Sequence, residues 1–178
     1  MQRFQLHRDD GDISVCHWAA PSKLVLHWAH ANGFNAQTYD PLLAPLAGDF
    51  DVYAADARGH GFSTLTADPA HYPGLDRYRD DLIFVLEHLC DKAGGKIWLG
   101  GHSMGGCASV MASALRPDLV AGLVLTDPVI MPRTARVIAR MLFRAQGGFI
   151  LAKNAAKRRA DWPDADTVKN AYTGRGAF

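Results

Sequence analysis

The amino-acid sequence predicts an α/β fold, in which a mostly parallel sheet carries helices on both faces and a helical, basic segment follows. Short runs rich in β-branched and aromatic residues alternate with segments of helical periodicity. The run 120–125 is nearly all apolar, as in a strand buried on both faces. Polar loops follow several predicted strands, and parallel strands bring their carboxyl ends to one edge of the sheet. We therefore expect a binding site at that edge.

The first half of the chain is predicted to open with a hairpin that leads into a buried strand. Three short β-like runs, 3–7, 13–18 and 24–30, are separated by turn residues. An Asn-Gly pair then interrupts the chain, and apolar residues recur at helical spacing over 39–46 before a glycine ends the segment. The next strand is predicted at 51–56.

The second half continues the alternation. A loop rich in Gly, Thr and Pro covers 58–73. The clearest helix follows, and its apolar stripe consists of Tyr78, Leu82, Val85, Leu86 and Leu89. A strand at 97–100, a helix at 104–115 and the strand at 120–125 come next. The sheet thus ends at about six strands, and beyond Pro132 the sequence becomes helical and Ala-rich.

Composition and charge narrow the function classes. The chain has 178 residues, 48% of them apolar and 21% charged, as in one soluble globular domain. A formal net charge of +1 gives no overall field for nucleic acid or an anionic membrane, so neither partner is expected. The charge is uneven, because residues up to Pro132 carry 9 basic and 15 acidic side chains and residues 133–178 carry 10 and 3.

Targeting and ligand patterns indicate a cytoplasmic protein without metal or cofactor. The sequence contains no signal-peptide pattern and no apolar segment long enough for stable membrane insertion. The cysteines stand in apolar surroundings without ligand spacing, which favours buried thiols in a reducing compartment; they are Cys16, Cys90 and Cys107. The metalloprotease, phosphate-loop and dinucleotide-binding patterns are absent. The sequence leaves the oligomeric state open.

A G-x-S-x-G motif occupies residues 101–105, between a predicted strand and a predicted helix. A nucleophile on so sharp a turn needs small residues on either side of it, and Gly101 and Gly105 supply them. The partial positive charge of the helix N-terminus and the N–H of Met104 favour an anion beside the Ser103 hydroxyl. These features predict a serine nucleophile, and a glycine-rich turn that happens to contain a serine is the alternative.

Three motifs together resemble the α/β-hydrolase fold family over the chain up to about Pro132. They are Gly-His-Ser-Met-Gly-Gly at 101–106, Asp-Ala-Arg-Gly-His-Gly-Phe-Ser at 56–63 and His-Ala-Asn-Gly-Phe-Asn at 30–35. The resemblance implies an oxyanion hole whose donors are the N–H groups of Phe34 and Met104. Gly33 would also let the backbone approach a ligand, and an ordinary Asn-Gly turn is the alternative there.

Other polar residues of these loops are expected to shape the site. Arg58 and the glycines near it predict a loop that is fixed by an ion pair. His30 is predicted to orient or pack its neighbours, and the His102 side chain is predicted to point away from Ser103. Asp127 follows the strand 120–125 at the same edge, so it is either the acid of a catalytic triad or a helix cap or loop anchor.

The sequence departs from the family in its histidines. The family's chain order is Ser, then acid, then His, whereas all eight histidines here precede Ser103. A serine hydroxyl is a poor nucleophile without a base, so this chain by itself is expected to be an inefficient hydrolase. In the resemblance, a helical cap follows the strand 120–125, and the acid and histidine come after it. We therefore expect a fragment with a hydrolase core at 1–132 and a partial cap or lid at 133–178.

The start of the predicted cap is amphipathic. Four basic side chains fall on one helical face, opposite an apolar face; they are Arg133, Arg136, Arg140 and Arg144. This pattern indicates a lid helix, and a helix that lies on a membrane surface is the alternative.

The leading hypothesis is a serine hydrolase that cleaves an ester, thioester or similar acyl bond of a small apolar substrate through a Ser103 acyl-enzyme. A carbon–carbon bond hydrolase, a haloperoxidase or an acyltransferase would use the same residues. A truncated product that binds ligand without turnover is the non-enzymatic alternative. Epoxide hydrolases and haloalkane dehalogenases are disfavoured, because their nucleophile at this turn is an aspartate.

Overall fold

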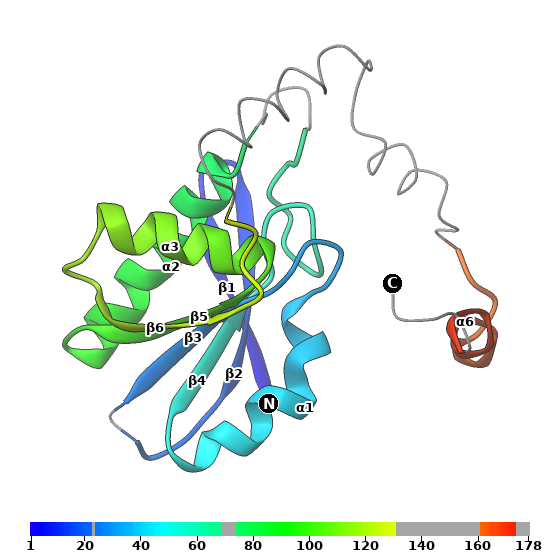
Figure 1. Cartoon of the computed structure of the whole chain (residues 1–178), viewed down its shortest axis with the longest axis horizontal. Coiled ribbons are helices and arrows are strands. Elements are labelled where there is room, and N and C mark those ends of the chain that lie inside the picture. Colours follow the sequence, from blue (N-terminus) through cyan, green and yellow to red (C-terminus); the bar gives the residue numbers. More distant parts are fainter. Residues whose placement is uncertain (23, 69–73, 131–160, 174–178) are drawn as a thin grey trace. The chain divides into compact units, whose positions relative to one another are not determined.

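A computed structural model of the chain describes residues 1–22, 24–68, 74–130 and 161–173 (Figure 1). The chain divides into two compact units, Met1–Ile130 and Met131–Phe178. The first unit contains the sheet.

Six strands form one sheet in the first unit. They are β1 (Gln2–Arg8), β2 (Gly11–Trp18), β3 (Val25–Ala29), β4 (Asp51–Ala55), β5 (Ile97–His102) and β6 (Val120–Thr126). Their order across the sheet is β1-β2-β4-β3-β5-β6. The predicted hairpin is present, because β1 and β2 pair antiparallel, and β2 is antiparallel to β4. The strands β4, β3, β5 and β6 are mutually parallel, so the loops that follow them lie at one edge.

The longer helices are α2 (Asp76–Ala93) and α3 (Met104–Leu115), both close to their predicted ranges. The segment predicted as one helix at 39–46 is instead three short pieces: η1 (Ala36–Tyr39), α1 (Asp40–Leu43) and η2 (Ala44–Gly48). Pro41 and Pro45 each stand at the start of one of these pieces. A proline has no backbone N–H to continue a helix, so each starts a new short turn.

The sheet has an apolar core on each face. One core packs α2 and α3 against the sheet and includes Leu86, Leu99 and Ala112. The other packs η1, α1 and η2 against the opposite face and includes Trp28 and Leu43. Figure 1 shows the two longer helices together on one side of the sheet and α1 on the other. Helices on both faces leave the carboxyl edge of the parallel strands as the open side of the fold.

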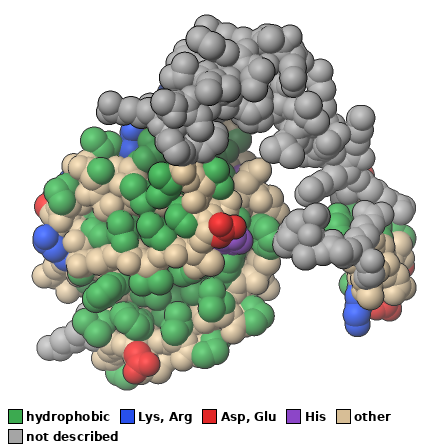
Figure 2. All heavy atoms as spheres, viewed as in Figure 1, with side chains coloured by type: hydrophobic (Ala, Val, Ile, Leu, Met, Phe, Trp, Pro, Cys, Tyr) green, Lys and Arg blue, Asp and Glu red, His purple; other side chains and the backbone are tan. Residues whose placement is uncertain are grey.

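The prediction that the strand 120–125 is buried on both faces is wrong. β6 lies at the edge of the sheet, where Leu123 and Val124 keep 38% and 48% of their surface exposed. Figure 2 shows many hydrophobic side chains on the face of the molecule turned to the viewer. An apolar sequence shows that a strand can be buried on both faces, but the position of the strand in the sheet decides whether it is.

The described part of the second unit contains one short helix, α6 (Ala165–Tyr172). Asp164 caps it, because its Oδ1 accepts the N–H of Thr167 at 2.6 Å. No helix among the described residues is long and apolar enough to cross a membrane. The predicted lid helix with its four arginines lies outside the described residues, so its amphipathic character stays a prediction.

Candidate active site

The turn between β5 and α3 holds Ser103 in a strained conformation. Its φ is 50° and its ψ is −110°, and among the described residues only Asp127 shares a positive φ without being glycine. A side chain costs free energy in this region, so such a residue persists only where its surroundings enforce it. The Ser103 N–H donates to the carbonyl oxygen of Thr126 at 3.0 Å, which ties the turn to the end of β6.

We call this turn the elbow (residues 101–106). Two glycines allow its close backbone contacts. A Cβ on Gly101 would lie 2.7 Å from the carbonyl oxygen of Gly105. A Cβ on Gly105 would lie 2.6 Å from the carbonyl oxygen of His30 and closer still to that of Ala29. Since these neighbours are backbone atoms, they cannot rotate away. The glycines therefore let the start of α3 pack directly against the end of β3.

The first amide of α3 is available to a ligand. Met104 begins the helix, and its N–H has no acceptor among the described residues. The next bond of the turn runs from the Cys107 N–H to the carbonyl oxygen of Ser103 at 3.0 Å. A free N–H at the N-terminus of a 12-residue helix attracts negative charge, because the helix dipole adds to it.

The loop after β3 is the second candidate source of a donor. Its Phe34 N–H donates to the carbonyl oxygen of Ala31 at 3.1 Å, so it closes a turn and reaches a ligand only by sharing its hydrogen. The Gly33 N–H donates to His60 Nε2 at 3.1 Å, and Gly33 has a φ of 79°. Among the described residues the Asn32 N–H has no acceptor. The Asn32 N–H is therefore a candidate oxyanion donor of this loop, in addition to the Phe34 N–H that the motif indicates.

His30 is held at both ring nitrogens. Its Nε2 accepts the Ala57 N–H at 2.9 Å, so Nδ1 carries the hydrogen that it donates to the Ala31 carbonyl oxygen at 2.8 Å. The ring is 1% exposed, and burial lowers its pKa. With both nitrogens occupied, the ring joins the loops after β3 and β4. The orienting role of His30 stays a prediction.

His102 faces the loop after β3. Its Nδ1 lies 2.7 Å from the hydroxyl oxygen of Tyr39, and its ring lies 6.3 Å from that of Phe34. The hydroxyl of Tyr39 also accepts the N–H of Ala31 at 3.1 Å. This link was not predicted from the sequence, in which Tyr39 reads only as an apolar helix position. Helical periodicity marks Tyr39 as an apolar position and gives no signal for a contact of its hydroxyl with a residue 63 positions further along the chain.

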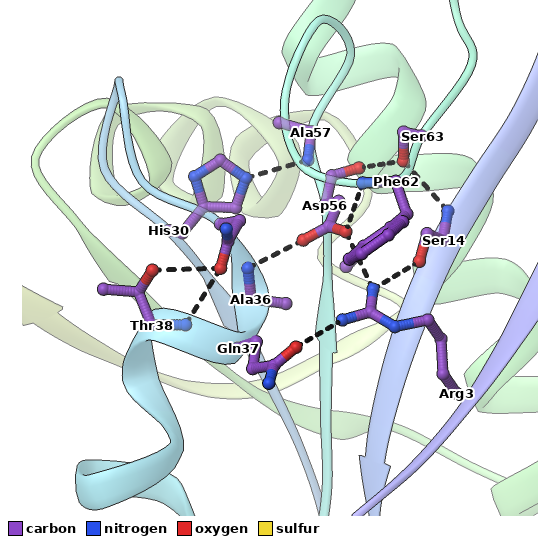
Figure 3. A network of polar contacts seen from close by, with 12 residues as sticks. Arg3, Ser14, His30, Ala36, Gln37, Thr38, Asp56, Ala57, Phe62 and Ser63 are labelled. Carbon is purple, nitrogen blue, oxygen red and sulfur yellow. Dashed lines mark hydrogen bonds and ion pairs between the residues drawn. The ribbon is translucent and has the colours of Figure 1, made fainter. Parts of the chain in front are cut away.

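Asp56 lies at the centre of a polar network below the loop after β4 (Figure 3). Its Oδ1 accepts the Ala36 N–H at 2.7 Å. Its Oδ2 accepts the Phe62 N–H and the Arg3 guanidinium, each at 2.9 Å. The side chain is fully buried, and both oxygens are occupied. This arrangement suits a scaffold residue, since nothing remains to bind a substrate.

Arg58 makes the ion pair that the sequence analysis expected in this loop. Its Nε and one terminal nitrogen donate to the two oxygens of Asp81 at 2.6 and 2.8 Å. The hydrogen bond to Asp81 raises the pKa of Arg58, and the side chain is 1% exposed. A buried bidentate pair of this kind fixes the loop to α2.

Asp127 stands at the carboxyl end of β6. It follows Thr126, whose carbonyl oxygen accepts the Ser103 N–H, and its own φ is 47°. It is exposed, and among the described residues its carboxylate has no hydrogen-bond partner. The backbone thus places Asp127 next to the elbow, on the neighbouring strand.

The described residues leave a cavity of about 360 Å³ at the amino ends of β3 and β4, lined among others by Ser22, Val25, Asp51 and Lys92. They contain no cluster of side chains suited to a metal ion. A cavity of about 40 Å³ lies under Met104 and Gly105, against α2 and the ring of His30. It has room for one or two water molecules and is too small for an acyl substrate.

A mostly parallel sheet with helices on both faces and a strained serine at a strand-to-helix turn defines the α/β-hydrolase class. A family profile described as "Serine aminopeptidase, S33" matches residues 20–168, and the chain belongs to this family of esterase- and lipase-type α/β hydrolases. An esterase from Mycobacterium tuberculosis is 34% identical over 72% of this chain and 41% of its own length. Human monoglyceride lipase is 32% identical over 68% of this chain and 41% of its own.

The solved structures agree on the fold. A hypothetical protein from Pseudomonas aeruginosa PAO1 aligns with a TM-score of 0.73 and 22% identity, over 99% of this chain and 61% of that protein. This likeness concerns the fold alone. The chain spans less than half the length of the curated relatives cited here.

Proposed function

We propose that this chain carries the nucleophile of a serine hydrolase that cleaves an ester or thioester of a small apolar acyl substrate. One observation carries the proposal: Ser103 is strained at the elbow, directly before an amide N–H that has no acceptor among the described residues. A hydroxyl held beside a free helix N-terminus is the arrangement that attack on a carbonyl requires.

The reaction would proceed in two steps. Ser103 Oγ attacks the carbonyl carbon and gives its proton to a base, while the Met104 N–H and an amide of the loop after β3 stabilise the oxyanion. The tetrahedral intermediate expels the alcohol or thiol, which takes the proton from the protonated base, and leaves an acyl-enzyme on Ser103. Water then attacks the acyl-enzyme with the same base, which releases the carboxylic acid and restores Ser103.

We place the base outside these 178 residues. The chain has eight histidines, and all precede Ser103. His27 and His30 are buried, His30 has both ring nitrogens occupied, and His102 Nδ1 contacts Tyr39. The 178-residue chain is therefore a fragment in this proposal, with residues 1–132 as its core and 133–178 as part of a cap. By itself it binds an acyl ligand with little turnover.

Asp127 is the proposed acid of this chain. Its positive φ and its place directly after Thr126 support the role, because strained residues cluster at functional sites. It would orient and stabilise the protonated base without taking its proton.

The test replaces Ser103 in the complete product of the gene. In Ser103→Ala we expect kcat/KM for p-nitrophenyl butyrate to fall by at least about 10³-fold, together with loss of labelling by a fluorophosphonate. Ser113→Ala is the matched control, because Ser113 lies further along α3 and its hydroxyl only donates to the Val110 carbonyl oxygen at 3.0 Å. Unchanged turnover in Ser103→Ala would refute the proposal.

A further inference from the structure

We propose that the Tyr39 hydroxyl is a positioning group that clamps the loop after β3 to the elbow and fixes the hydrogen of His102 on Nε2. This inference rests on the proposed function, because the two segments that it joins are those that supply the oxyanion donors.

The clamp consists of two hydrogen bonds to one oxygen. Tyr39 Oη accepts the Ala31 N–H at 3.1 Å and lies 2.7 Å from His102 Nδ1. Burial raises the pKa of Tyr39, so the hydroxyl stays protonated at neutral pH. Among the described residues His102 Nδ1 is the one acceptor in contact with this hydroxyl, so we assign the hydroxyl hydrogen to that bond. Nδ1 is then the acceptor, and the ring hydrogen is on Nε2.

The ring of Tyr39 is held in place by aromatic neighbours. Its centroid lies 5.8 Å from that of Trp28 and 6.0 Å from that of Phe34. Trp28 in turn occupies space left by Gly100 on β5, where a Cβ would come within 2.8 Å of the indole Cζ3. The hydroxyl therefore has a fixed position relative to both strands, β3 and β5.

The clamp holds Ala31, the residue directly before the candidate donor Asn32. The Ala31 N–H is held by Tyr39, and the Ala31 carbonyl oxygen accepts both the Phe34 N–H at 3.1 Å and His30 Nδ1–H at 2.8 Å. The direction of the Asn32 amide follows from these bonds. An oxyanion hole built from two segments works only if their separation is fixed before the reaction. Tyr39 supplies that fixed separation with a single side chain.

Tyr39→Phe tests the clamp, because it removes the oxygen and keeps the ring. In the ¹⁵N-histidine-labelled 178-residue chain, we expect His102 to change from one tautomer to a mixture of two. We also expect exchange of the Ala31 amide hydrogen to accelerate by about 10-fold or more. In the complete gene product, kcat for p-nitrophenyl butyrate should fall by about 10-fold, with KM changed by less than about twofold.

Tyr53→Phe is the matched control. Tyr53 is buried, and its hydroxyl donates to Asp51 at 2.8 Å on β4, away from the elbow. It should leave the His102 tautomer, the Ala31 exchange and kcat unchanged.

An unchanged His102 tautomer in Tyr39→Phe overturns the clamp, and so does an altered tautomer with unchanged kcat. If the complete product shows no hydrolysis that depends on Ser103, the proposed function and the positioning role both fail. In that case the tautomer of the 178-residue chain still decides whether Tyr39 fixes His102.

Discussion

Two loops at the carboxyl edge of the sheet, one after β4 and one after β5, use their polar groups in opposite ways. In the loop after β4, Asp56 has both carboxylate oxygens occupied and Arg58 is paired with Asp81. In the loop after β5, Ser103 has a strained backbone and Met104 has an N–H without an acceptor among the described residues.

The hydrogen bonding of the two loops distinguishes structural residues from candidate catalytic residues more clearly than residue type does. A carboxylate and a guanidinium look more reactive in a sequence than a serine and a methionine amide. Full hydrogen bonding removes that reactivity, whereas strain and an unused donor create it. We therefore expect changes in the loop after β4 to affect stability, and changes at the elbow to affect turnover.

The largest effect that we expect on stability comes from Asp56→Ala. The substitution leaves the buried N–H of Ala36 and the N–H of Phe62 without their acceptor, and it removes the carboxylate partner of Arg3. Breaking a buried pair of this kind costs about 3–5 kcal/mol. The free energy of unfolding, measured by urea titration, should fall by that amount.

Asp49→Ala is the surface control for this comparison, because Asp49 is exposed at the end of η2. It should change the free energy of unfolding by less than about 0.5 kcal/mol. An Asp56→Ala variant as stable as Asp49→Ala would show that the loop after β4 is not the scaffold described here.

The sequence predicts this contrast only in part. The G-x-S-x-G spacing identifies the elbow, because only glycine tolerates the close backbone contacts on either side of Ser103. The pairing of Arg58 was expected, but its partner Asp81 lies on α2, 23 residues further along the chain. Periodicity carries no information on such a contact. For the same reason the sequence missed Tyr39 and placed β6 in the interior, since both depend on which strands become neighbours.

We expect the stability of the fold to depend on pH through a buried histidine on β3, the strand next to β4. His27 on β3 is 1% exposed, its Nε2 accepts the Ala55 N–H at 3.2 Å, and its Nδ1 has no partner among the described residues. Burial lowers the pKa of His27 to about 3, and the neighbouring His30 adds to this effect. The folded state therefore keeps the ring neutral at pH values where the unfolded chain binds a proton.

Above pH 6.5, the ordinary pKa of histidine, His27 is neutral in both the folded and the unfolded state, and the fold has its full stability. As the pH falls toward the folded pKa near 3, the unfolded chain binds a proton that the folded state does not bind, so the free energy of unfolding decreases. Between pH 7 and pH 5 the free energy of unfolding should fall by about 2 kcal/mol from this residue. Urea titrations across this range measure the slope. His27→Gln should flatten it, and an equal slope in this variant would assign the pH dependence to other groups.

The smallest effect concerns the strain at the elbow. Ser103→Gly should raise the free energy of unfolding by about 1 kcal/mol, because glycine adopts a φ of 50° without the steric cost that a side chain pays. Ser103→Ala keeps a Cβ and hence the strain, so its stability should match that of the parent chain. Both variants remove the hydroxyl and should be equally inactive. The pair therefore separates the strain of the turn from the chemistry of the serine, and equal stability of the two variants would show that the turn stores no strain.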